Sequence, residues 1–261
     1  MDELRVSSWG ELNEMLYEGS WQPDIRRHRA TYAYRGMSDA GHDLSHSLSR
    51  LGKESARLEG HILRNFRKYA PRESVPGDSV WNWLAVGQQH GLPTRLLDWT
   101  YSPYVALHFA TQDLEAFDRD GLVWCLDYAA ANEYLPSRLR EILRQEGSDT
   151  FTAEMLACVA RTVRELEQLA EEPFLLSLEP PSVDDRIVNQ FALFSLISDP
   201  TVSHDRWIGE HPRLVRKIAI PASLKWEIRD KLDQANITER VLYPGLDGLG
   251  RWLARYYTPR T

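Results

Sequence analysis

Hydrophobic residues recur every three or four positions in several segments, a spacing typical of helices with one buried face. Between residues 54 and 69 this pattern includes Leu58, Ile62 and Phe66. The same spacing predicts further helices over residues 81–89, 102–110, 137–145, 152–171, 222–234 and 246–256. Pro103 lies in the first turn of the helix over 102–110, where its missing N–H does no harm.

Other segments are short runs of β-branched and aromatic residues, which favour strands. The run Thr31–Gly36 predicts a strand whose end exposes Arg35. Further strands are predicted over residues 121–127, 174–178, 191–197 and 214–220 and near 240–243. Because helices and strands are segregated, we predict an α+β fold with a mixed, largely antiparallel sheet and a helical N-terminal half packed on it. No stretch is long enough to be a linker, so residues 1–261 are expected to form a single domain.

Charge and composition argue against DNA and membranes as partners of the protein. Asp and Glu number 38 against 31 Lys and Arg, a net charge of −7, which argues against a broad DNA-binding face. The N-terminal residues do not resemble a signal peptide, and no run of about 18 apolar residues occurs. We therefore expect a cytoplasmic protein without a membrane partner. Cys125 and Cys158 lie in apolar stretches and are expected to be inert buried thiols.

Several standard catalytic motifs are missing from the sequence. It has no phosphate-binding Gly-x-x-x-x-Gly-Lys loop, no Gly-x-Gly-x-x-Gly, no His-Glu-x-x-His and no Gly-x-Ser-x-Gly. His42 and His46 have the spacing of one helix face, but they lie among turn-forming residues without a third ligand. We therefore expect no metal site there.

The densest group of polar residues lies between residues 87 and 100, around the turn Gly91–Pro93. This segment contains Gln89, His90, Thr94, Arg95, Asp98 and Trp99. Loops with several converging donors and acceptors are often functional. Alternatively, Asp98 caps the following helix or pairs with Arg95 to hold the turn.

Several motifs of the chain occur in the same order in one known family. They are Tyr34-Arg35-Gly36, the segment from Gln89 to Thr100, Ala106–Ala110, Arg186-Ile-x-x-Gln190-x-x-x-Phe194 and residues 242–249. On these residues the chain resembles the FRG domain family, named for its Phe/Tyr-Arg-Gly element, from about residue 30 to residue 253. Ala192 stands where the family usually has Gly.

The resemblance implies a role in bacterial conflict, as a toxin or phage-defence effector, with an antitoxin or a phage protein as partner. It also implies a distant likeness to ADP-ribosyltransferases, which use NAD as co-substrate and transfer ADP-ribose to a protein or nucleic-acid acceptor. Those enzymes place an Arg near the end of a first strand and a Glu or Gln near the start of a late strand. Arg35 and Gln190 occupy comparable places here.

Under this interpretation, Arg35 binds phosphate or ribose, with Arg95 as a second candidate, because a guanidinium stays charged and contacts two oxygens. Asp98 or Gln190 orients the ribose or the acceptor, and Tyr34 or Trp99 offers a ring to nicotinamide. His90 is a candidate general base. Gly36, Gln89 and Thr94 complete the expected binding set. The alternatives are an ion pair of Arg35 with Glu59 or Asp98, and a His90 held only by the turn.

Two hypotheses from other classes stay open. A metal-dependent nuclease would use Asp98, Glu179, Asp184 and Asp185 around a divalent ion. A non-catalytic module would sense a nucleotide or a phage protein in the same cleft, or hold a short RNA on the basic run Arg26–Arg29.

Overall fold

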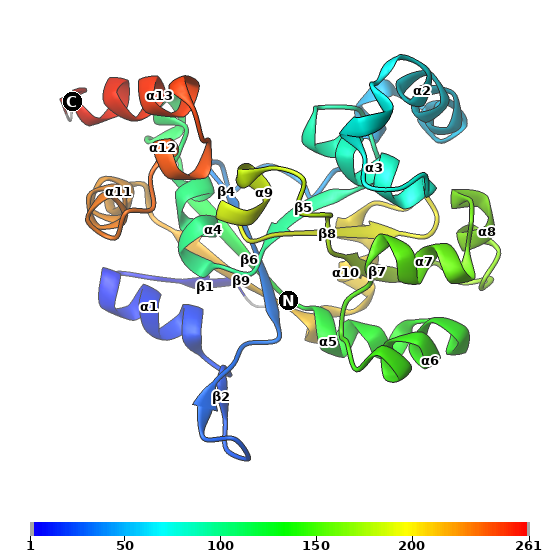
Figure 1. The fold of residues 1–261 in the computed structure, drawn as a ribbon. Coiled ribbons are helices and arrows are strands. Elements are labelled where there is room, and N and C mark those ends of the chain that lie inside the picture. The colour runs from blue at the N-terminus through cyan, green and yellow to red at the C-terminus, as the bar shows by residue number, and fades with distance from the viewer. Residues whose placement is uncertain (1–2, 260–261) are drawn as a thin grey trace.

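The computed structural model describes residues 3–259 and contains a seven-stranded sheet (Figure 1). In spatial order the strands are β1 (Glu3–Arg5), β9 (Val215–Ile220), β6 (Gly121–Asp127), β4 (Tyr32–Met37), β5 (Leu97–Thr100), β8 (Ala192–Ile197) and β7 (Leu175–Leu178). β1 runs parallel to β9, whereas all other neighbours are antiparallel. The fold is α+β with a largely antiparallel sheet, as predicted.

The sheet nearly separates between β4 and β5. These strands share one register pair, Tyr34 with Thr100, whereas β4 pairs with β6 over the whole length from Tyr32 to Met37. The sheet therefore has two parts, β1-β9-β6-β4 and β5-β8-β7, joined at one point. Beyond that point the facing backbone groups of β4 and β5 need other polar partners.

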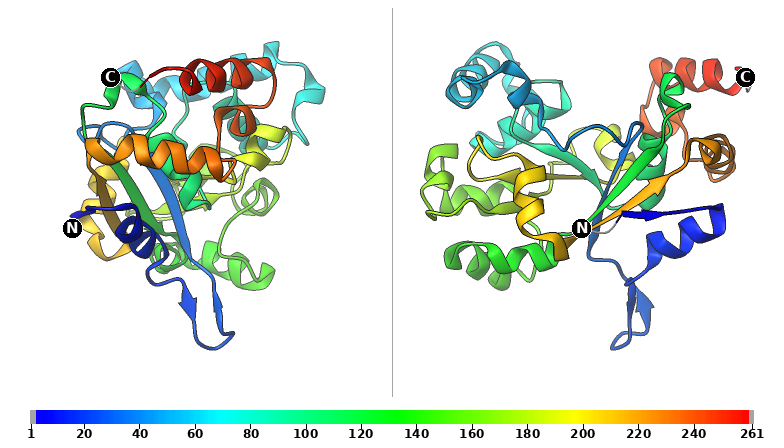
Figure 2. Two further views of the ribbon diagram at one scale, coloured as in Figure 1. Left: turned by 90° about the vertical axis from the view of Figure 1, so that its left-hand side faces the viewer. Right: turned by 180° about the vertical axis from the view of Figure 1, so that it is seen from behind.

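Helices surround both parts of the sheet (Figures 1 and 2). They are α1 (Trp9–Tyr17), α2 (Ser55–Tyr69), α3 (Val80–Gln89), α4 (Pro103–Ala110), α5 (Tyr128–Ala131), α6 (Ser137–Glu146), α7 (Ala153–Val159), α8 (Val163–Glu167), α9 (Asp185–Asn189), α10 (His204–Glu210), α11 (Lys225–Gln234), α12 (Glu239–Leu242) and α13 (Leu246–Tyr256). None of the helices within residues 3–259 is both long and apolar enough to cross a lipid bilayer.

Buried hydrophobic side chains attach these helices to the sheet. One cluster joins α1, α4 and α11 to β4, β6 and β9, with Leu12, Leu107 and Ile228 among its members. A second cluster joins α2, α3, α6 and α7 to β7 and β8. A third includes Trp207 of α10 and residues from both parts of the sheet. The two parts are thus packed together although few strand bonds connect them.

Most predicted elements are confirmed, but two segments differ. Residues 152–171 form two helices, because Thr162 has an extended backbone and its side chain caps the second of them, α8. The strand predicted near residues 240–243 is wrong, since this segment is the helix α12. Cys125 is buried as expected, whereas Cys158 is exposed, and both thiols are free.

The basic run Arg26–Arg29 lies in a small hairpin formed by β2 (Trp21–Gln22) and β3 (Arg27–His28). Figure 2 shows this hairpin extending away from the rest of the molecule. Residues 26–29 are all exposed, and the Trp21 and His28 rings lie 5.0 Å apart. The run is therefore a solvated surface rather than part of the cleft described below.

Candidate functional site

Arg35 lies at the point where β4 and β5 separate. Its Nη1 atom donates a hydrogen bond of 2.6 Å to the main-chain carbonyl of Asp98 in β5. In a continued antiparallel ladder Asp98 would face Gly36, so the guanidinium satisfies a carbonyl that has lost its strand partner. Arg35 Nε is buried without a hydrogen-bond partner, and among the described residues no acceptor reaches Nη2.

Gly36 lets helix α4 approach this strand closely. A Cβ atom at this position would lie 1.8 Å from the carbonyl oxygen of Ala106 and 2.6 Å from the amide nitrogen of Ala110. Any side chain would therefore push α4 away from β4. The Arg-Gly dipeptide combines a cationic side chain with a close contact between strand and helix.

The carboxylate of Asp98 is held in place by α3 and the turn that follows it. Gln88 Nε2 donates a hydrogen bond of 3.0 Å to Asp98 Oδ2, and Thr94 Oγ1 donates in turn to Gln88 Oε1. Thr94 Oγ1 also accepts from the amide of Leu96 at 3.2 Å. The hydroxyl thus fixes the Gln88 amide, which presents its NH₂ group to Asp98.

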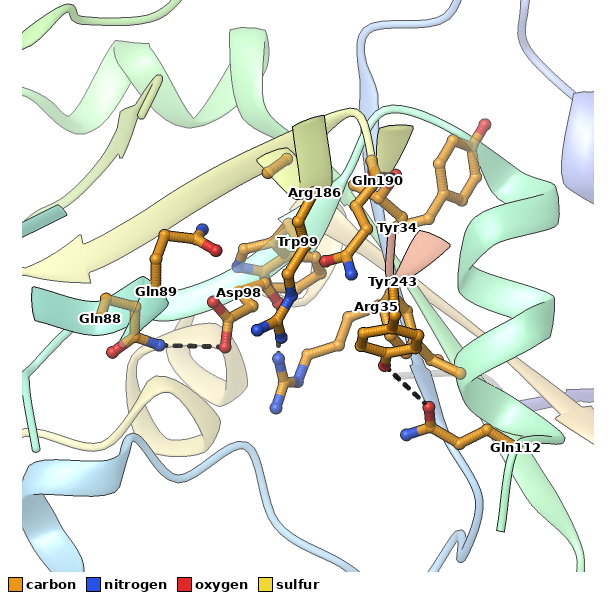
Figure 3. A pocket seen from close by; sticks show the side chains of 14 residues that line it. Tyr34, Arg35, Gln88, Gln89, Asp98, Trp99, Gln112, Arg186, Gln190 and Tyr243 are labelled. Carbon is orange, nitrogen blue, oxygen red and sulfur yellow. Dashed lines mark hydrogen bonds between the residues drawn. The ribbon is translucent and has the colours of Figure 1, made fainter. Parts of the chain in front are cut away.

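A cavity of about 300 Å³ opens between the two parts of the sheet, and Arg35, Asp98 and Gln190 line it together with Arg186 and Tyr243 (Figure 3). Its size is at the lower end of the range for small-molecule sites. Figure 3 shows the guanidinium groups of Arg35 and Arg186 turned toward one another, beside the Asp98 carboxylate and the Tyr243 ring.

The wall opposite Asp98 comes from α9 and α12. The Arg186 guanidinium carbon lies 5.2 Å from the centre of the Tyr243 ring, and the Tyr243 hydroxyl donates to Gln112 Oε1 at 3.2 Å. Gln190 Nε2 donates to the carbonyl of Leu242 at 2.9 Å. These contacts fix an arginine, an aromatic ring and an amide on one wall of the cavity.

Charges in the cavity favour an anionic ligand. Burial lowers the pKa of the Arg35 guanidinium from its usual value, and the charge of Asp98 opposes that shift. Burial raises the pKa of the Tyr243 hydroxyl, and the charge of Arg186 opposes that shift. Two guanidiniums face one carboxylate, and like charges that converge repel each other. An anion bound between Arg35 and Arg186 would relieve this repulsion.

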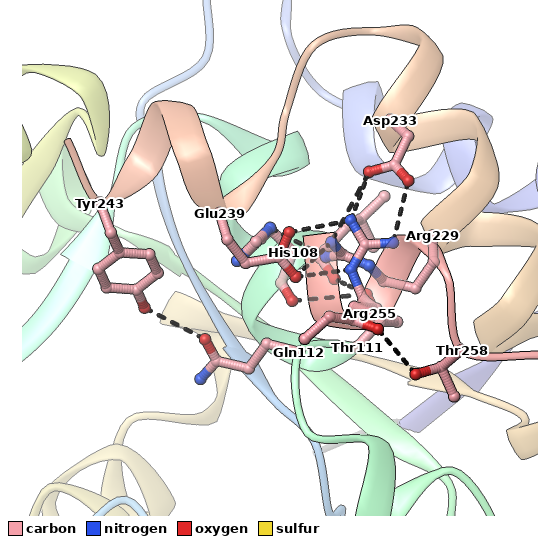
Figure 4. A network of polar contacts seen from close by, with 11 residues as sticks. His108, Thr111, Gln112, Arg229, Asp233, Glu239, Tyr243, Arg255 and Thr258 are labelled. Carbon is pink, nitrogen blue, oxygen red and sulfur yellow. Dashed lines mark hydrogen bonds and ion pairs between the residues drawn. The ribbon is translucent and has the colours of Figure 1, made fainter. Parts of the chain in front are cut away.

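A buried ionic network holds the α12 wall in place (Figure 4). Arg255 Nε donates to Glu239 Oε1 at 2.6 Å, and Arg229 bridges Glu239 and His108 at 3.1 and 2.9 Å. Burial alone would raise the pKa of Glu239, but its hydrogen bonds with Arg255 and the charge of Arg229 lower it to about 2. The network ties α12 to α4, α11 and α13 and so fixes Tyr243.

Residues 30–119 match the sequence model of the FRG domain. The chain carries an FRG domain. Searches of curated proteins and of solved structures find no significant match to the chain. The matched segment of the FRG domain includes Arg35, Gly36 and Asp98, whereas Arg186 and Tyr243 come from later in the chain.

Seven of the ten predicted site residues line the cavity. They are Tyr34, Arg35, Gly36, Gln89, Asp98, Trp99 and Gln190. Two of them have little surface to offer a ligand, because Tyr34 and Trp99 are only 1% and 4% exposed. The Tyr34 hydroxyl donates to the Leu16 carbonyl, and Trp99 Nε1 donates to Ser195 Oγ. The rings of Tyr243 and Phe109 also line the cavity and are less buried than those of Tyr34 and Trp99.

Three predicted residues lie outside the cavity. Arg95 is 2% exposed and forms ion pairs with Glu59 and Glu167, so its guanidinium is used within the fold. Thr94 is buried and acts through Gln88. His90 is exposed at the end of α3, where it borders a separate apolar groove, so the structure separates it from Arg35.

The structure also bears on the alternative interpretations of Arg35 and of the acidic residues. Arg35 contacts the carbonyl of Asp98 rather than its carboxylate, and Glu59 pairs with Arg95 instead. Asp184 caps α9, and Glu179 accepts a hydrogen bond from Tyr101. Within residues 3–259 no group of three or more His, Cys, Asp or Glu side chains is arranged to hold a metal ion.

Sequence reasoning about the site missed Arg186, Tyr243 and Gln88. The first two belong to motifs that carry the FRG resemblance, Arg186 four positions before Gln190 and Tyr243 next to Leu242. Membership of these motifs could have indicated both residues as candidates for the site. Gln88 had no such signal, because its role depends on hydrogen bonds to Thr94 and Asp98 that only the fold creates.

Proposed function

We propose that the cavity binds NAD and breaks the bond between nicotinamide and ribose, as an ADP-ribosyltransferase does. The observation that carries this proposal is the convergence of Arg35 and Arg186 beside the carboxylate of Asp98. A dinucleotide offers both charges that such a site needs, an anionic pyrophosphate and a ribose that becomes cationic during the reaction.

Arg35 and Arg186 bind the pyrophosphate in this proposal. A guanidinium is planar and permanently charged, so it can donate two parallel hydrogen bonds to phosphate oxygens. Arg35 is already oriented by its bond to the Asp98 carbonyl, which leaves other N–H groups free. Arg186 is exposed at the cavity and close to Tyr243, whose ring limits its freedom. Less conformational entropy is lost when such oriented groups bind.

Asp98 stabilises the transition state. When the bond to nicotinamide breaks, its electron pair leaves with nicotinamide and positive charge develops on the ribose. A nucleophile of the acceptor, or water, then forms the new bond to this carbon and loses a proton. A carboxylate held in place before the reaction stabilises the developing cation without having to reorganise. Gln88 holds Asp98 in this way, whereas the neutral amide of Gln190 cannot supply the charge.

The cavity holds the nicotinamide half of the dinucleotide. With a volume of about 300 Å³ it is too small to enclose both nucleotides of NAD. The adenosine half therefore extends outside, past the two arginines. The Tyr243 ring packs against the nicotinamide ring in this arrangement, a role that Tyr34 and Trp99 are too buried to fill.

The proposal is tested by incubating the protein with NAD labelled in nicotinamide and separately in adenine, with and without cell extract. We expect free nicotinamide to be released, with the adenine label either in ADP-ribose or on a macromolecule. Binding of NAD without release of nicotinamide would favour the non-catalytic sensing module. Failure to bind NAD would contradict the proposal.

The FRG resemblance adds an effector role in bacterial conflict to this proposal. An enzyme that consumes NAD lowers the NAD content of the cell that makes it. Induced expression of the wild-type chain in a bacterial host should therefore lower cellular NAD and slow growth. Expression of the Arg35→Gln variant to the same level should do neither, and equal growth arrest by both proteins would contradict the effector role.

A further inference from the structure

The side-chain amide of Gln190 has a fixed orientation. Its Nε2 atom lies 2.9 Å from the carbonyl oxygen of Leu242, which can only accept a hydrogen bond. This contact assigns the nitrogen to the Leu242 side and leaves Oε1 on the other side. Among the described residues no donor reaches Oε1, while the side chain lines the cavity.

The surroundings keep Gln190 from turning over. The residue is 8% exposed, and its main-chain carbonyl accepts a hydrogen bond of 2.6 Å from Thr100 Oγ1 in β5. Leu242 belongs to α12, which the ionic network around Glu239 fixes. Exchanging the nitrogen and oxygen of the amide would place two acceptors against each other at the Leu242 carbonyl, so this orientation is retained.

Gln190 Oε1 is therefore a neutral acceptor in a cavity whose charged groups are two donors, Arg35 and Arg186, and one carboxylate, Asp98. The guanidiniums of Arg35 and Arg186 only donate, and the Asp98 carboxylate already accepts from Gln88. A fixed acceptor of this kind recognises a ligand that donates, because a ligand without the donor leaves the acceptor unpaired when water is displaced.

Two groups of NAD can donate from a planar ring, the carboxamide NH₂ of nicotinamide and the amine of adenine. Asp98 acts on the ribose that carries nicotinamide, so this half of the molecule occupies the cavity together with Gln190. We infer that Gln190 selects dinucleotides whose pyridine ring carries a primary carboxamide, because its Oε1 accepts a hydrogen bond from that NH₂ group. The inference rests on the proposed function and adds its substrate specificity.

Two NAD analogues separate these donors. The 3-acetylpyridine analogue keeps the size and charge of NAD but replaces NH₂ with a methyl group, and the hypoxanthine analogue replaces the adenine amine with a carbonyl oxygen, which accepts instead of donating. For the wild-type protein kcat/KM is measured for all three compounds, or Kd if no turnover occurs. After correction for intrinsic reactivity, we expect kcat/KM for the acetylpyridine analogue to be about tenfold or more lower than for NAD. The hypoxanthine analogue should have the same kcat/KM as NAD.

Comparing the wild-type protein with a Gln190 variant corrects for the intrinsic reactivity of the analogue. Leaving-group reactivity cancels when the ratio of NAD to acetylpyridine analogue is compared between wild type and Gln190→Leu. The ratio should fall about tenfold in Gln190→Leu and stay unchanged in Gln234→Leu, which alters an exposed glutamine at the end of α11 outside the cavity lining. Thermal unfolding checks that each variant folds, and Gln190→Met replaces Gln190→Leu if the latter does not.

The outcomes distinguish the two proposals. Wild-type protein that neither binds nor cleaves any of the dinucleotides overturns the proposed function and this inference with it. Cleavage or binding of NAD with the same ratio in wild type and Gln190→Leu overturns the inference alone. If instead kcat/KM falls for the hypoxanthine analogue and not for the acetylpyridine analogue, adenine lies at Gln190, and the inference is again overturned.

Discussion

Arg35 and Asp98 connect the two parts of the sheet beside the cavity. Arg35 Nη1 lies 2.6 Å from the Asp98 carbonyl oxygen, next to the single register pair of Tyr34 and Thr100. A side chain therefore replaces the strand bond that is lost where β4 and β5 separate. The same guanidinium faces the cavity that this separation creates, which explains why an arginine at this position serves both the fold and a ligand.

Replacing the cavity arginines should remove activity without unfolding the protein. Arg35→Gln and Arg186→Gln each keep amide donors but lose the charge that binds the pyrophosphate. We expect each to reduce NAD consumption about 100-fold or more, from the loss of charged hydrogen bonds worth about 1.5–3 kcal/mol each and of ligand orientation. The melting temperature should stay within a few degrees of the wild-type value.

Arg164→Gln is the matched control for these two variants, since Arg164 is exposed on α8 and remote from the cavity lining. It should consume NAD at the wild-type rate. If Arg35→Gln unfolds the protein in proportion to its loss of activity, Arg35 acts only in the fold.

Replacing Arg95 should lower the stability of the protein, unlike replacing the cavity arginines, because the ion pair of Arg95 with Glu59 is buried. Removing one partner leaves the other charge unpaired, which typically costs about 3–5 kcal/mol. Arg95→Gln and Glu59→Gln should each lower the free energy of unfolding, measured in urea, by about this amount. Arg57→Gln is the control, since its pair with Glu54 is exposed and should contribute less than about 1 kcal/mol. Equal effects of Arg95→Gln and Arg57→Gln would contradict this role of Arg95.

Gly36 should not tolerate even the smallest side chain. Gly36→Ala places a Cβ atom against the backbone of α4, so we expect a loss of about 1–3 kcal/mol or more in unfolding experiments. Gly60→Ala provides the contrast, because Gly60 is exposed within α2 and has no atom near the added Cβ. That substitution should stabilise the protein by about 0.5–1 kcal/mol. A neutral Gly36→Ala would show that α4 can move away from β4.

Acid should destabilise the protein from about pH 6.5 downward. Burial lowers the pKa of His204 to about 3 from its ordinary value of 6.5, assisted by the charges of His46 and Arg35. Between these values this histidine binds a proton in the unfolded chain but not in the folded one, which lowers the free energy of unfolding by about 1.4 kcal/mol per pH unit as pH decreases. His108, whose pKa burial also lowers to about 3, adds a loss of the same size. Below about pH 4.5, protonation of Glu239 in the unfolded chain adds a loss of the same sign.

The measurement is urea unfolding of wild type and His204→Gln at several pH values between 7 and 4. The slope of stability against pH should be smaller in the variant by the contribution of one proton. An unchanged slope would show that His204 is not held neutral in the folded protein.

The sequence predicted those parts of the fold that depend on local patterns. The helix α13 was predicted with its observed bounds, because its apolar residues recur at helical spacing. The strand β5 was interpreted as part of a polar bend, since four residues that include Asp98 carry little strand signal. Its place beside β8 depends on pairing with residues almost a hundred positions away. The segment after Thr238 became a helix because Glu239 joins a buried ionic network that local propensity does not reveal.

The same distinction applies to the site. Arg35 was found from its motif, and the structure brings it together with Asp98 and Gln190. Arg95 has a similar setting in the sequence, yet Glu59, 36 positions earlier, binds it in the core. Which of two arginines reaches a ligand is decided by such distant partners, and the sequence pattern alone does not contain them.

Hydrogen exchange measured with and without saturating NAD tests most directly whether the opening between β4 and β5 is the dinucleotide site. We predict slower exchange in peptides that contain Arg35, residues 94–98 and residues 186–190, and no change in the hairpin at residues 21–28. Unchanged exchange in the first three segments, or protection confined to another part of the molecule, would contradict the account.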